Sequence, residues 1–242
     1  MSKEIGIVAA LEREVKPATK RWQSRIQKYG DREFKFFENV RAVLVCGGIG
    51  AEASRRAAEA MISLYAPGTV VSIGFAGALE AGFKVGDLFV PRSVVDARDG
   101  SRIETAVGKG TLVSSPSIAD EVQKRRLAKS YAAQVVDMEA ASVGVAAGLH
   151  GTRFFAVKAI SDELGFAMPP LSRFVGANGR FKSWKFAVYC VVRPWLWRPV
   201  LCLAKNSARA RQSLWRWLNQ YNEPEFLKNN PDQLHPMSKI PS

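Results

Sequence analysis

The chain has 242 residues, of which 47% are hydrophobic, so it can form one substantial core and is not a disordered protein. Its first apolar run, Ile5–Ala10, is too short for a secretory signal, and no run of about eighteen uncharged apolar residues is present. The three cysteines, Cys46, Cys190 and Cys202, are odd in number and lie in apolar segments. We expect small core thiols in a reducing, cytoplasmic compartment and not a disulfide framework.

The net charge of +13 is distributed unevenly along the chain. Between Leu164 and Asn222 there is no Asp or Glu, whereas ten Lys or Arg residues and five of the six tryptophans fall in this stretch. Such a composition is basic and interfacial in character. We therefore predict a globular domain at 1–185, a basic, Trp-rich helical arm at 186–222, and a loose tail at 223–242 with little to bury.

The predicted elements alternate between strands and helices. In chain order we expect strands at Ile5–Ala10, Phe34–Phe37 and Ala42–Val45, a helix at Ala51–Tyr65, strands at Thr69–Ile73, Val85–Pro91 and Gly110–Ser114, a helix at Ile118–Ala128, a strand at Gln134–Val136, a helix at Glu139–Ala147, a strand at Phe154–Ile160 and a helix at Leu203–Leu218. Glycine loops are expected at Gly47–Gly50 and Gly74–Leu79. This order favours the α/β class, with a central mixed sheet flanked by helices and a basic C-terminal helical arm.

Three of the apolar runs end in acidic residues. Glu14 follows the first strand, Glu139 follows the strand Gln134–Val136, and Asp162 follows the run Phe154–Ile160. Ligands of α/β sheets bind at the carboxyl ends of the strands. We therefore expect these three carboxylates to lie at one edge of the sheet.

Each of the three carboxylates has a chemical and a structural interpretation. A carboxyl group such as Asp162 in a partly apolar cleft can act as a general acid, but Ser161 or Asp162 could instead cap a helix. Glu139 could bind the vicinal hydroxyls of a sugar, or be a capping acid beside a core Met138. Glu14 could act on a ligand or be an exposed acid on a first helical turn.

The order and spacing of these motifs resemble the purine nucleosidase and nucleoside phosphorylase superfamily. The motifs are Ala10-Leu11-Glu12-Arg13-Glu14-Val15, Met138-Glu139 and Ala159-Ile160-Ser161-Asp162. The likeness runs from Glu4 to Asp162 and is closest to the 5′-methylthioadenosine/S-adenosylhomocysteine nucleosidases. It implies a phosphorylase/nucleosidase-like catalytic domain at 1–185 that cleaves the N-ribosidic bond of an adenine-type nucleoside.

The resemblance also implies residue roles. Asp162 would protonate the purine and Ser161 would help to hold it. Glu139 would bind the ribose hydroxyls, with Met138 against the apolar face of the sugar. Glu14 would activate the attacking water.

Two glycine-containing stretches complete the implied site. Ile49 and Gly50 would line the nucleoside site, and Ala76 and Gly77 would lie against the base. Phe75 stands where the family often has a small polar residue, which makes that wall bulkier and more apolar.

The chain departs from the nucleosidases at two places. Between Ala97 and Gly110 it has only a short polar link where the family carries a longer lid, and Ser114–Ile118 lacks the aromatic that packs on adenine. A short lid and a basic arm also resemble the hopanoid-associated phosphorylases, which act on a lipid-linked adenosyl group. Inorganic phosphate would then be a co-substrate, although Arg13 is the one nearby candidate to bind it.

No cofactor is expected, and no metal site, because His150 and His235 have no second ligand close by. The resemblance implies a homo-oligomer. The arm could rest on an anionic membrane surface, peripheral on the inner face, or pack on the core or a second subunit. The alternative of another class is a non-catalytic nucleoside- or membrane-surface-binding protein. Val, Leu and Cys between the arm's Trp and Arg residues argue against nucleic acid as a partner.

Overall fold

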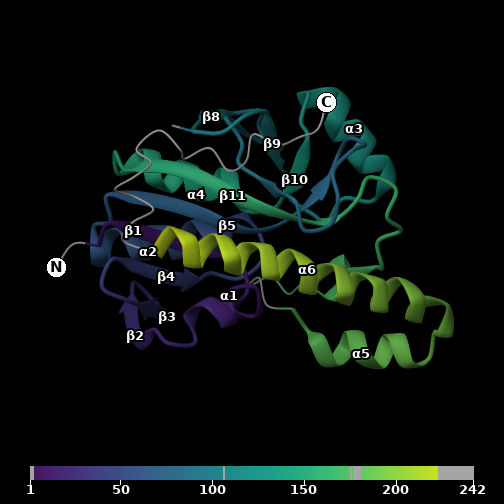
Figure 1. Cartoon of the computed structure of the whole chain (residues 1–242), viewed down its shortest axis with the longest axis horizontal. Helices are drawn as coiled ribbons and strands as arrows, with labels where there is room; N and C mark the ends of the chain where they lie inside the picture. Colours follow the sequence, from purple (N-terminus) through teal and green to yellow (C-terminus); the bar gives the residue numbers. More distant parts are fainter. Residues whose placement is uncertain (1–2, 106, 175, 177–180, 223–242) are drawn as a thin grey trace.

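The structure, a computed structural model, describes residues 3–105, 107–174, 176 and 181–222. It confirms the α/β class, with a mixed sheet flanked by helices (Figure 1). The strands are β1 (Ile5–Ala9), β2 (Gln23–Tyr29), β3 (Arg32–Glu38), β4 (Ala42–Cys46), β5 (Thr69–Ala78), β6 (Leu88–Phe89), β7 (Ser93–Asp96), β8 (Arg102–Glu104), β9 (Thr111–Ser114), β10 (Val135–Asp137) and β11 (Arg153–Asp162). The helices are α1 (Glu12–Thr19), α2 (Ala51–Tyr65), α3 (Glu121–Tyr131), α4 (Ala140–Leu149), α5 (Ser183–Val191) and α6 (Trp197–Asn222), with short 3₁₀ turns at Leu171–Phe174 and Pro194–Leu196.

The sheet runs in the order β2-β3-β4-β1-β5-β10-β9-β7-β8, and β11 pairs with β5 and β6. The long strands β5 and β11 are parallel to each other, and β1 is parallel to β5. Their carboxyl ends therefore reach the same edge of the sheet. A shift of register between Ile160 and Asp162 marks a bulge at Ser161, and bulges of this kind reorient side chains beside active sites.

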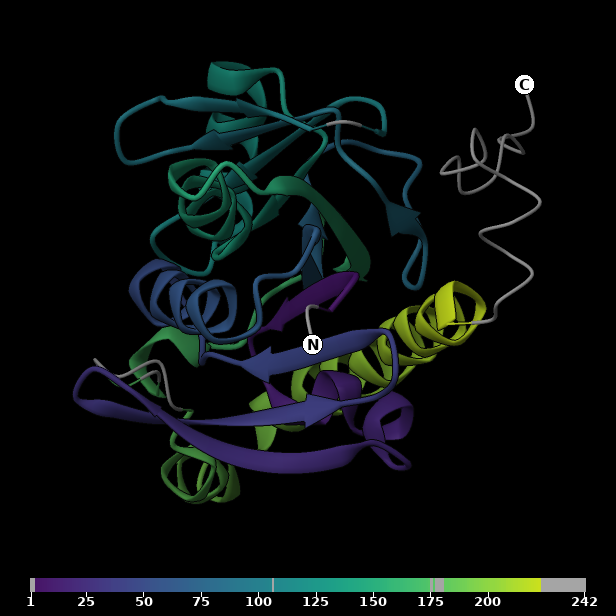
Figure 2. The same ribbon diagram turned by 90° about the vertical axis from the view of Figure 1, so that its left-hand side faces the viewer.

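Two apolar layers cover the central strands, one on each face. On one face α2 and α4 pack together, with Met61 and Val143 in the core cluster. On the other face α6 packs against β11 and α1, and buries Ala210, Leu214 and Leu218. The 90° view in Figure 2 shows the strands of residues 23–46 and 93–114 at opposite ends of the molecule.

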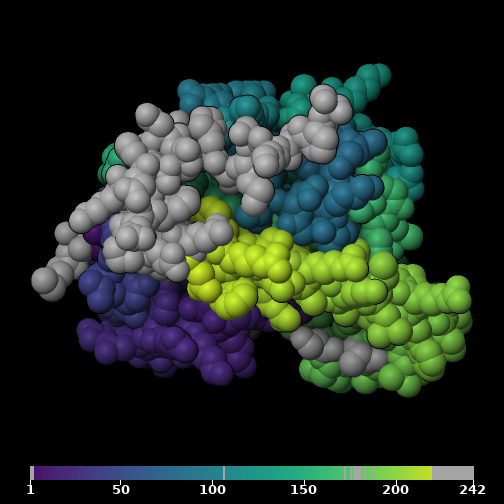
Figure 3. Space-filling view, viewed as in Figure 1, coloured from purple at the N-terminus to yellow at the C-terminus, as the bar shows by residue number. Residues whose placement is uncertain are grey.

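The C-terminal helices combine a packed part and a projecting part. The second half of α6 belongs to the core, whereas α5 and the first turns of α6 extend beyond the body of the molecule (Figures 1 and 3). The predicted domain limit at residue 185 falls inside α5. Among the described residues, no single helix is long and apolar enough to cross a bilayer, although α5 and Pro194–Asn219, bent by 116°, together have that length and composition.

The sequence-based elements differ from the structure at several points. The expected loop Gly74–Leu79 is wrong, because Gly74–Ala78 continues β5 between β11 and β10. The short polar link after Ala97 includes strand β8, which pairs with β7. The expected helix at Ile118–Ala128 starts later, at Glu121, where the Asp120 side chain accepts from the N–H of Gln123.

Other differences concern polar strands and the cysteines. The edge strand β2 was not expected because its side chains are mostly exposed and form no apolar run. All three cysteines are free, but Cys202 is exposed, so the expectation that it is a core residue is wrong. Cys190 is buried and Cys46 is half-buried. The predicted tail at 223–242, with His235, lies outside the described residues.

Candidate active site

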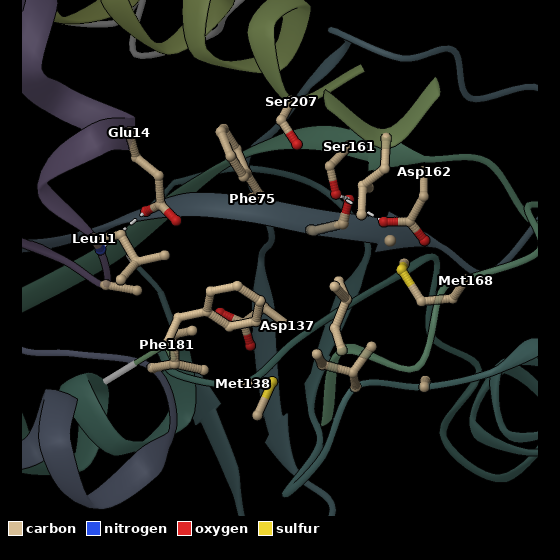
Figure 4. Close-up of a pocket in the computed structure, with 18 of the residues that line it drawn as sticks. Leu11, Glu14, Phe75, Asp137, Met138, Ser161, Asp162, Met168, Phe181 and Ser207 are labelled. Atoms are coloured by element: carbon tan, nitrogen blue, oxygen red, sulfur yellow. Dashed lines mark hydrogen bonds between the residues drawn. The ribbon is translucent and has the colours of Figure 1, made fainter. Parts of the chain in front are cut away.

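A cavity of about 530 Å³ opens at the edge where β1, β5, β10 and β11 end (Figure 4). It brings together all but one of the predicted site residues, namely Glu14, Ile49, Ala76, Gly77, Met138, Glu139, Ser161 and Asp162. Gly50 is the exception, and its backbone N–H donates to Oε1 of Glu139 at 2.8 Å. The three carboxylates that follow apolar runs thus line one cavity, although β10 is antiparallel to β5.

Asp162 is the last residue of β11 and is 3% exposed. The Ser161 hydroxyl donates to its Oδ1 at 2.7 Å, and Nζ of Lys124 donates to its Oδ2 at 2.5 Å. No helix begins at this point among the described residues, so the helix-capping interpretation of Ser161 and Asp162 is wrong. Asp162 is a cavity carboxylate with a donor on each oxygen.

Glu139 precedes α4 but does not cap it with its side chain. Its carboxylate accepts from the backbone N–H groups of Gly50, at 2.8 Å, and Met138, at 3.2 Å. Burial and, to a smaller extent, the negative charge of Asp137 together raise the pKa of Glu139 to about 7. The capping interpretation of Glu139 is therefore wrong.

Glu14 lies in the first turn of α1, but it is only 5% exposed. Burial raises the pKa of Glu14 to about 7, and the nearby charge of Glu139 contributes to this shift. The backbone N–H of Leu11 donates to its Oε2 at 3.4 Å. The interpretation of Glu14 as an exposed helical acid is wrong, and its raised pKa is typical of a carboxylate that exchanges a proton near neutral pH.

A buried Lys158 lies beside these two glutamates and was missed in the sequence. Its Nζ forms an ion pair with Asp137 at 2.8 Å and donates to the Ser72 hydroxyl at 2.9 Å. The charge of Lys158 lowers the pKa of Glu14 and of Glu139. The sequence did contain a signal for Lys158, because a lysine in the middle of an apolar strand must have a buried polar partner.

Lys124 was also missed, because it lies in a helix rich in charged residues that reads as a solvent-exposed surface. In the structure it is 2% exposed and lines the cavity beside Asp162. Nothing in the helical pattern distinguishes Lys124 from Arg125 and Arg126, which follow it.

Phe75 lines the cavity as expected, but other aromatic and apolar lining residues come from segments that were not expected there. Ser117 and Ile118 line the cavity, and aromatic side chains reach it from Phe75, Phe181 and Phe186. One whole wall belongs to α6, whose lining residues are Val200, Leu203, Ala204, Ser207, Ala208 and Arg211. The predicted arm is therefore part of the site. Within the described residues, no group of three or more His, Cys, Asp or Glu side chains could hold a metal ion.

The curated relatives of this chain are nucleosidases. It is 28% identical over 92 residues to the 5′-methylthioadenosine/S-adenosylhomocysteine nucleosidase of Buchnera aphidicola subsp. Schizaphis graminum, covering 37% of this chain and 39% of the relative. The corresponding nucleosidase of the Acyrthosiphon pisum subspecies is 29% identical over 96 residues, covering 37% of this chain and 40% of that protein. The chain thus matches about two fifths of the length of these relatives.

Solved structures share the fold. A mutant of the Helicobacter pylori nucleosidase with 5′-methylthioadenosine in its active site has a TM-score of 0.64 at 20% identity, covering 91% of this chain and 100% of that one. Futalosine hydrolase of Helicobacter pylori has a TM-score of 0.59 at 22% identity, covering 67% and 88%. The sequence model of the phosphorylase superfamily matches residues 4–107 and 97–180. The chain belongs to this superfamily.

Proposed function

We propose that the protein hydrolyses the N-ribosidic bond of an adenine-type nucleoside. The observation that carries the proposal is the placement of Glu14 and Asp162 on opposite sides of one cavity, as Figure 4 shows. We call the side with Ser161, Asp162 and Lys124 the base end, and the side with Leu11 and Glu14 the water end. A nucleoside bound between the two ends would have its base at Asp162 and the sugar carbon that water attacks at Glu14.

At the base end, Asp162 would protonate a ring nitrogen of the purine as it leaves. Ser161 holds Oδ1 of Asp162, so the carboxyl plane is fixed before substrate arrives. Gly77 pairs with Asp162 across the two central strands, and a side chain at position 77 would collide with the Asp162 carboxylate. Glycine at this position therefore leaves room for the carboxyl group at the cavity wall.

In the middle of the cavity, Glu139 would accept hydrogen bonds from the ribose hydroxyls. Its two backbone donors fix the carboxylate, and Met138 lines the cavity next to it. A carboxylate held in this way can stabilise the positive charge that develops on the sugar ring as the bond breaks. Met138 would pack on the apolar face of the sugar.

At the water end, Glu14 would remove a proton from the attacking water. A general base works best when its pKa is close to the working pH, and burial raises the pKa of Glu14 to about 7. Phosphate is the alternative acceptor, and the basic side chain beside Glu14 is Arg13, which also lies 5.7 Å from the ring of Phe181. Arg211 of α6 is the other arginine that lines the cavity. The raised pKa of Glu14, which suits a base that activates water, favours water over phosphate.

The test is adenine release from methylthioadenosine and adenosylhomocysteine in phosphate-free buffer. Hydrolysis predicts free sugar and adenine without phosphate. Product that forms only with phosphate, as a ribose 1-phosphate, would make the protein a phosphorylase with inorganic phosphate as co-substrate. Tight binding of these nucleosides with no turnover under either condition would make it a non-catalytic nucleoside-binding protein.

A second candidate function is supported by the α6 wall. The cavity continues from the carboxylates to apolar side chains of α6, including Val200 and Leu203. This extension suits a nucleoside whose 5′ position carries a long apolar group, such as an adenosyl group linked to a membrane lipid in hopanoid biosynthesis. Adenosines with 5′-alkylthio chains of increasing length test this, because kcat/KM should rise with chain length.

Leu203 and Leu201 provide a matched pair for that test. Leu203 lines the cavity, whereas Leu201, two residues earlier on α6, is 69% exposed. Leu203→Gln should remove the preference for long chains, and Leu201→Gln should keep it. Equal kcat/KM values for short and long chains in the wild type would contradict the lipid-linked substrate.

We further propose that the projecting tip, made of α5 and the start of α6, rests on an anionic membrane at its cytoplasmic face. Its large apolar side chains are exposed, namely Trp184, Val188, Val191, Val192, Trp195, Trp197 and Leu201. Lys185, Arg193 and Arg198 lie among them, and each basic residue near an anionic surface contributes about 1 kcal/mol of attraction. The tip thus combines apolar contact with charge complementarity.

Co-sedimentation with vesicles of anionic or of neutral lipid tests this proposal. Removing the whole arm would also remove core residues such as Leu214, so point changes are needed. Val191→Ser with Trp195→Ser should weaken sedimentation with anionic vesicles, and the control Val122→Ser should not, because Val122 on α3 is equally exposed at 67%. Equal sedimentation of wild type and tip variant would contradict membrane docking.

A further inference from the structure

Lys124 is the one residue of α3 that is buried. The rest of the helix is half-buried or exposed, and its first turn is fixed by the Asp120 side chain, which accepts from the N–H of Gln123. A lysine that is 2% exposed must have partners for its charge, because an unpaired buried ammonium is strongly destabilising. Those partners identify what the side chain does.

The ammonium of Lys124 binds the acid of the base end. Its Nζ donates to Oδ2 of Asp162 at 2.5 Å and to the backbone oxygen of Glu163 at 2.9 Å. A Cβ placed on Gly77 would lie 2.7 Å from Oδ2 of Asp162 and 3.3 Å from Nζ of Lys124. Glycine at position 77 thus leaves the space in which the ammonium and the carboxylate meet.

The ion pair between Lys124 and Asp162 determines which group can supply the proton that the leaving base needs. A general acid must carry a proton when the base leaves. As an ionised carboxylate that accepts from Ser161 and Lys124, Asp162 has no proton of its own to give. The nearest proton on a charged donor is the one that Lys124 shares with Oδ2, at the wall of the same cavity.

We infer that Lys124 supplies the proton that Asp162 delivers to the leaving purine, an inference that rests on the proposed N-ribosidic cleavage. As the bond between base and sugar breaks, its electron pair moves to the purine. A ring nitrogen takes a proton from Asp162, and Asp162 takes one from Nζ of Lys124, which becomes a neutral amine.

The cycle closes at the water end. Water adds its hydroxide to the sugar carbon and gives its other proton to Glu14. After adenine leaves, Lys124 takes a proton from solvent and Glu14 releases one, so that the net reaction is nucleoside plus water to adenine plus sugar. Lys124 acts through Asp162 and is therefore a positioning residue, not a group that touches substrate.

Two substitutions separate proton supply from simple charge pairing. Lys124→Arg keeps the positive charge and the hydrogen-bond donors, but a guanidinium does not lose its proton in proteins. Lys124→Met keeps the stem and removes the charge. If Lys124 supplies the proton, both variants lose about 10²-fold or more in kcat for adenine release from methylthioadenosine.

A substrate that needs no acid is the matched control. The leaving group of 4-nitrophenyl riboside departs as an anion, so its cleavage should stay within about threefold of wild type in both Lys124 variants. Asp162→Asn should show the same pattern, whereas Glu14→Gln should lose activity on both substrates. In the wild type, the pH profile for methylthioadenosine should have an alkaline limb that the nitrophenyl substrate lacks.

Wild-type adenine release by Lys124→Arg would overturn the inference, and so would equal losses on both substrates. If Lys124→Met fails to fold because the Asp162 charge is left unpaired, Lys124→Arg keeps that charge paired and decides the question, with thermal unfolding as the check. A wild-type protein inactive on both substrates would instead refute the proposed function, which keeps the two failures distinguishable.

Discussion

At the base end of the cavity the carboxylate of Asp162 is bonded directly to a buried ammonium, whereas at the water end Glu14 is buried with another carboxylate, Glu139, close enough to raise its pKa. Burial raises the pKa of both Glu14 and Glu139 to about 7. The carboxylates of the two ends therefore have different neighbours, a cation at the base end and a second carboxylate at the water end. Before substrate binds, the base end therefore holds a paired carboxylate and ammonium, and the water end holds a buried carboxyl group whose pKa is raised.

Each end has a buried lysine, and the difference lies in how that lysine is bonded. Lys124 contacts Asp162 itself. Lys158 instead pairs with Asp137 and donates to Ser72, so its charge lowers the pKa of Glu14 and Glu139 without a direct hydrogen bond to either in the described structure. The Lys124 ammonium is thus in direct contact with the carboxylate that it serves, whereas the Lys158 charge acts on the two glutamates only through space.

The most damaging change at the base end is Asp162→Asn. An amide keeps the hydrogen-bonding shape but cannot transfer a proton, so adenine release should fall by about 10²–10⁴-fold. The measurement is kcat for methylthioadenosine, with circular dichroism to show that the variant folds. Near-normal turnover would remove Asp162 from the mechanism.

The corresponding change at the water end is Glu14→Gln, which removes the base that activates water. We expect a loss of about 10²-fold in hydrolysis. Glu12→Gln is the matched control, because Glu12 is on the same helix but exposed and pairs with Lys35 at 3.3 Å. If Glu14→Gln and Glu12→Gln had the same activity, the water end would have no catalytic base at position 14.

Apolar runs and strand-end acids predicted most of the fold. The buried strands β1, β4, β5 and β11 stand out because they are covered on both faces. The polar edge strand β2 gives no such signal, and the glycines of β5 resemble a loop until their neighbours across the sheet are known. Pairing partners, not local pattern, make Gly74 and Gly77 strand residues.

The carboxylates of the site were predictable, but their cations were not. Glu14, Glu139 and Asp162 follow apolar runs, so position in the chain identifies them. Lys124 lies on a helix whose other charges face solvent, and only the tertiary contact with Asp162 distinguishes it. Packing of the arm on the core was one of its expected alternatives and is confirmed for α6, but the contribution of α6 to the cavity wall is evident only in three dimensions.

The pH dependence of hydrolysis follows from the water end. Glu14 must be ionised to accept a proton, and Glu139 must be ionised to hold the ribose, so the acidic limb of kcat/KM should fall as the pH decreases below about 7. At pH 6 about a tenth of each group is ionised, so the loss lies between about tenfold and a hundredfold. A profile that is flat from pH 5 to pH 8 would contradict these roles.

The smallest predicted effect is on stability, and it has the opposite sign to the effect on activity. The folded pKa of Glu14, about 7, lies above its ordinary value of 4.5, so the folded state binds more protons between these values and stability falls as the pH rises through this window.

Glu14→Gln removes the cost of a buried negative charge and should raise the free energy of unfolding by about 2–3 kcal/mol at pH 8, which corresponds to roughly 5 °C or more in Tm. At pH 5 wild-type Glu14 is protonated when folded but still partly ionised when unfolded, so the gain should shrink to about 1 kcal/mol or less. Thermal unfolding at the two pH values measures this, with Glu12→Gln expected to stay within about 0.5 kcal/mol of wild type at both. A variant that is less stable than wild type at pH 8 would show that Glu14 is stabilised by its surroundings and not held there for catalysis.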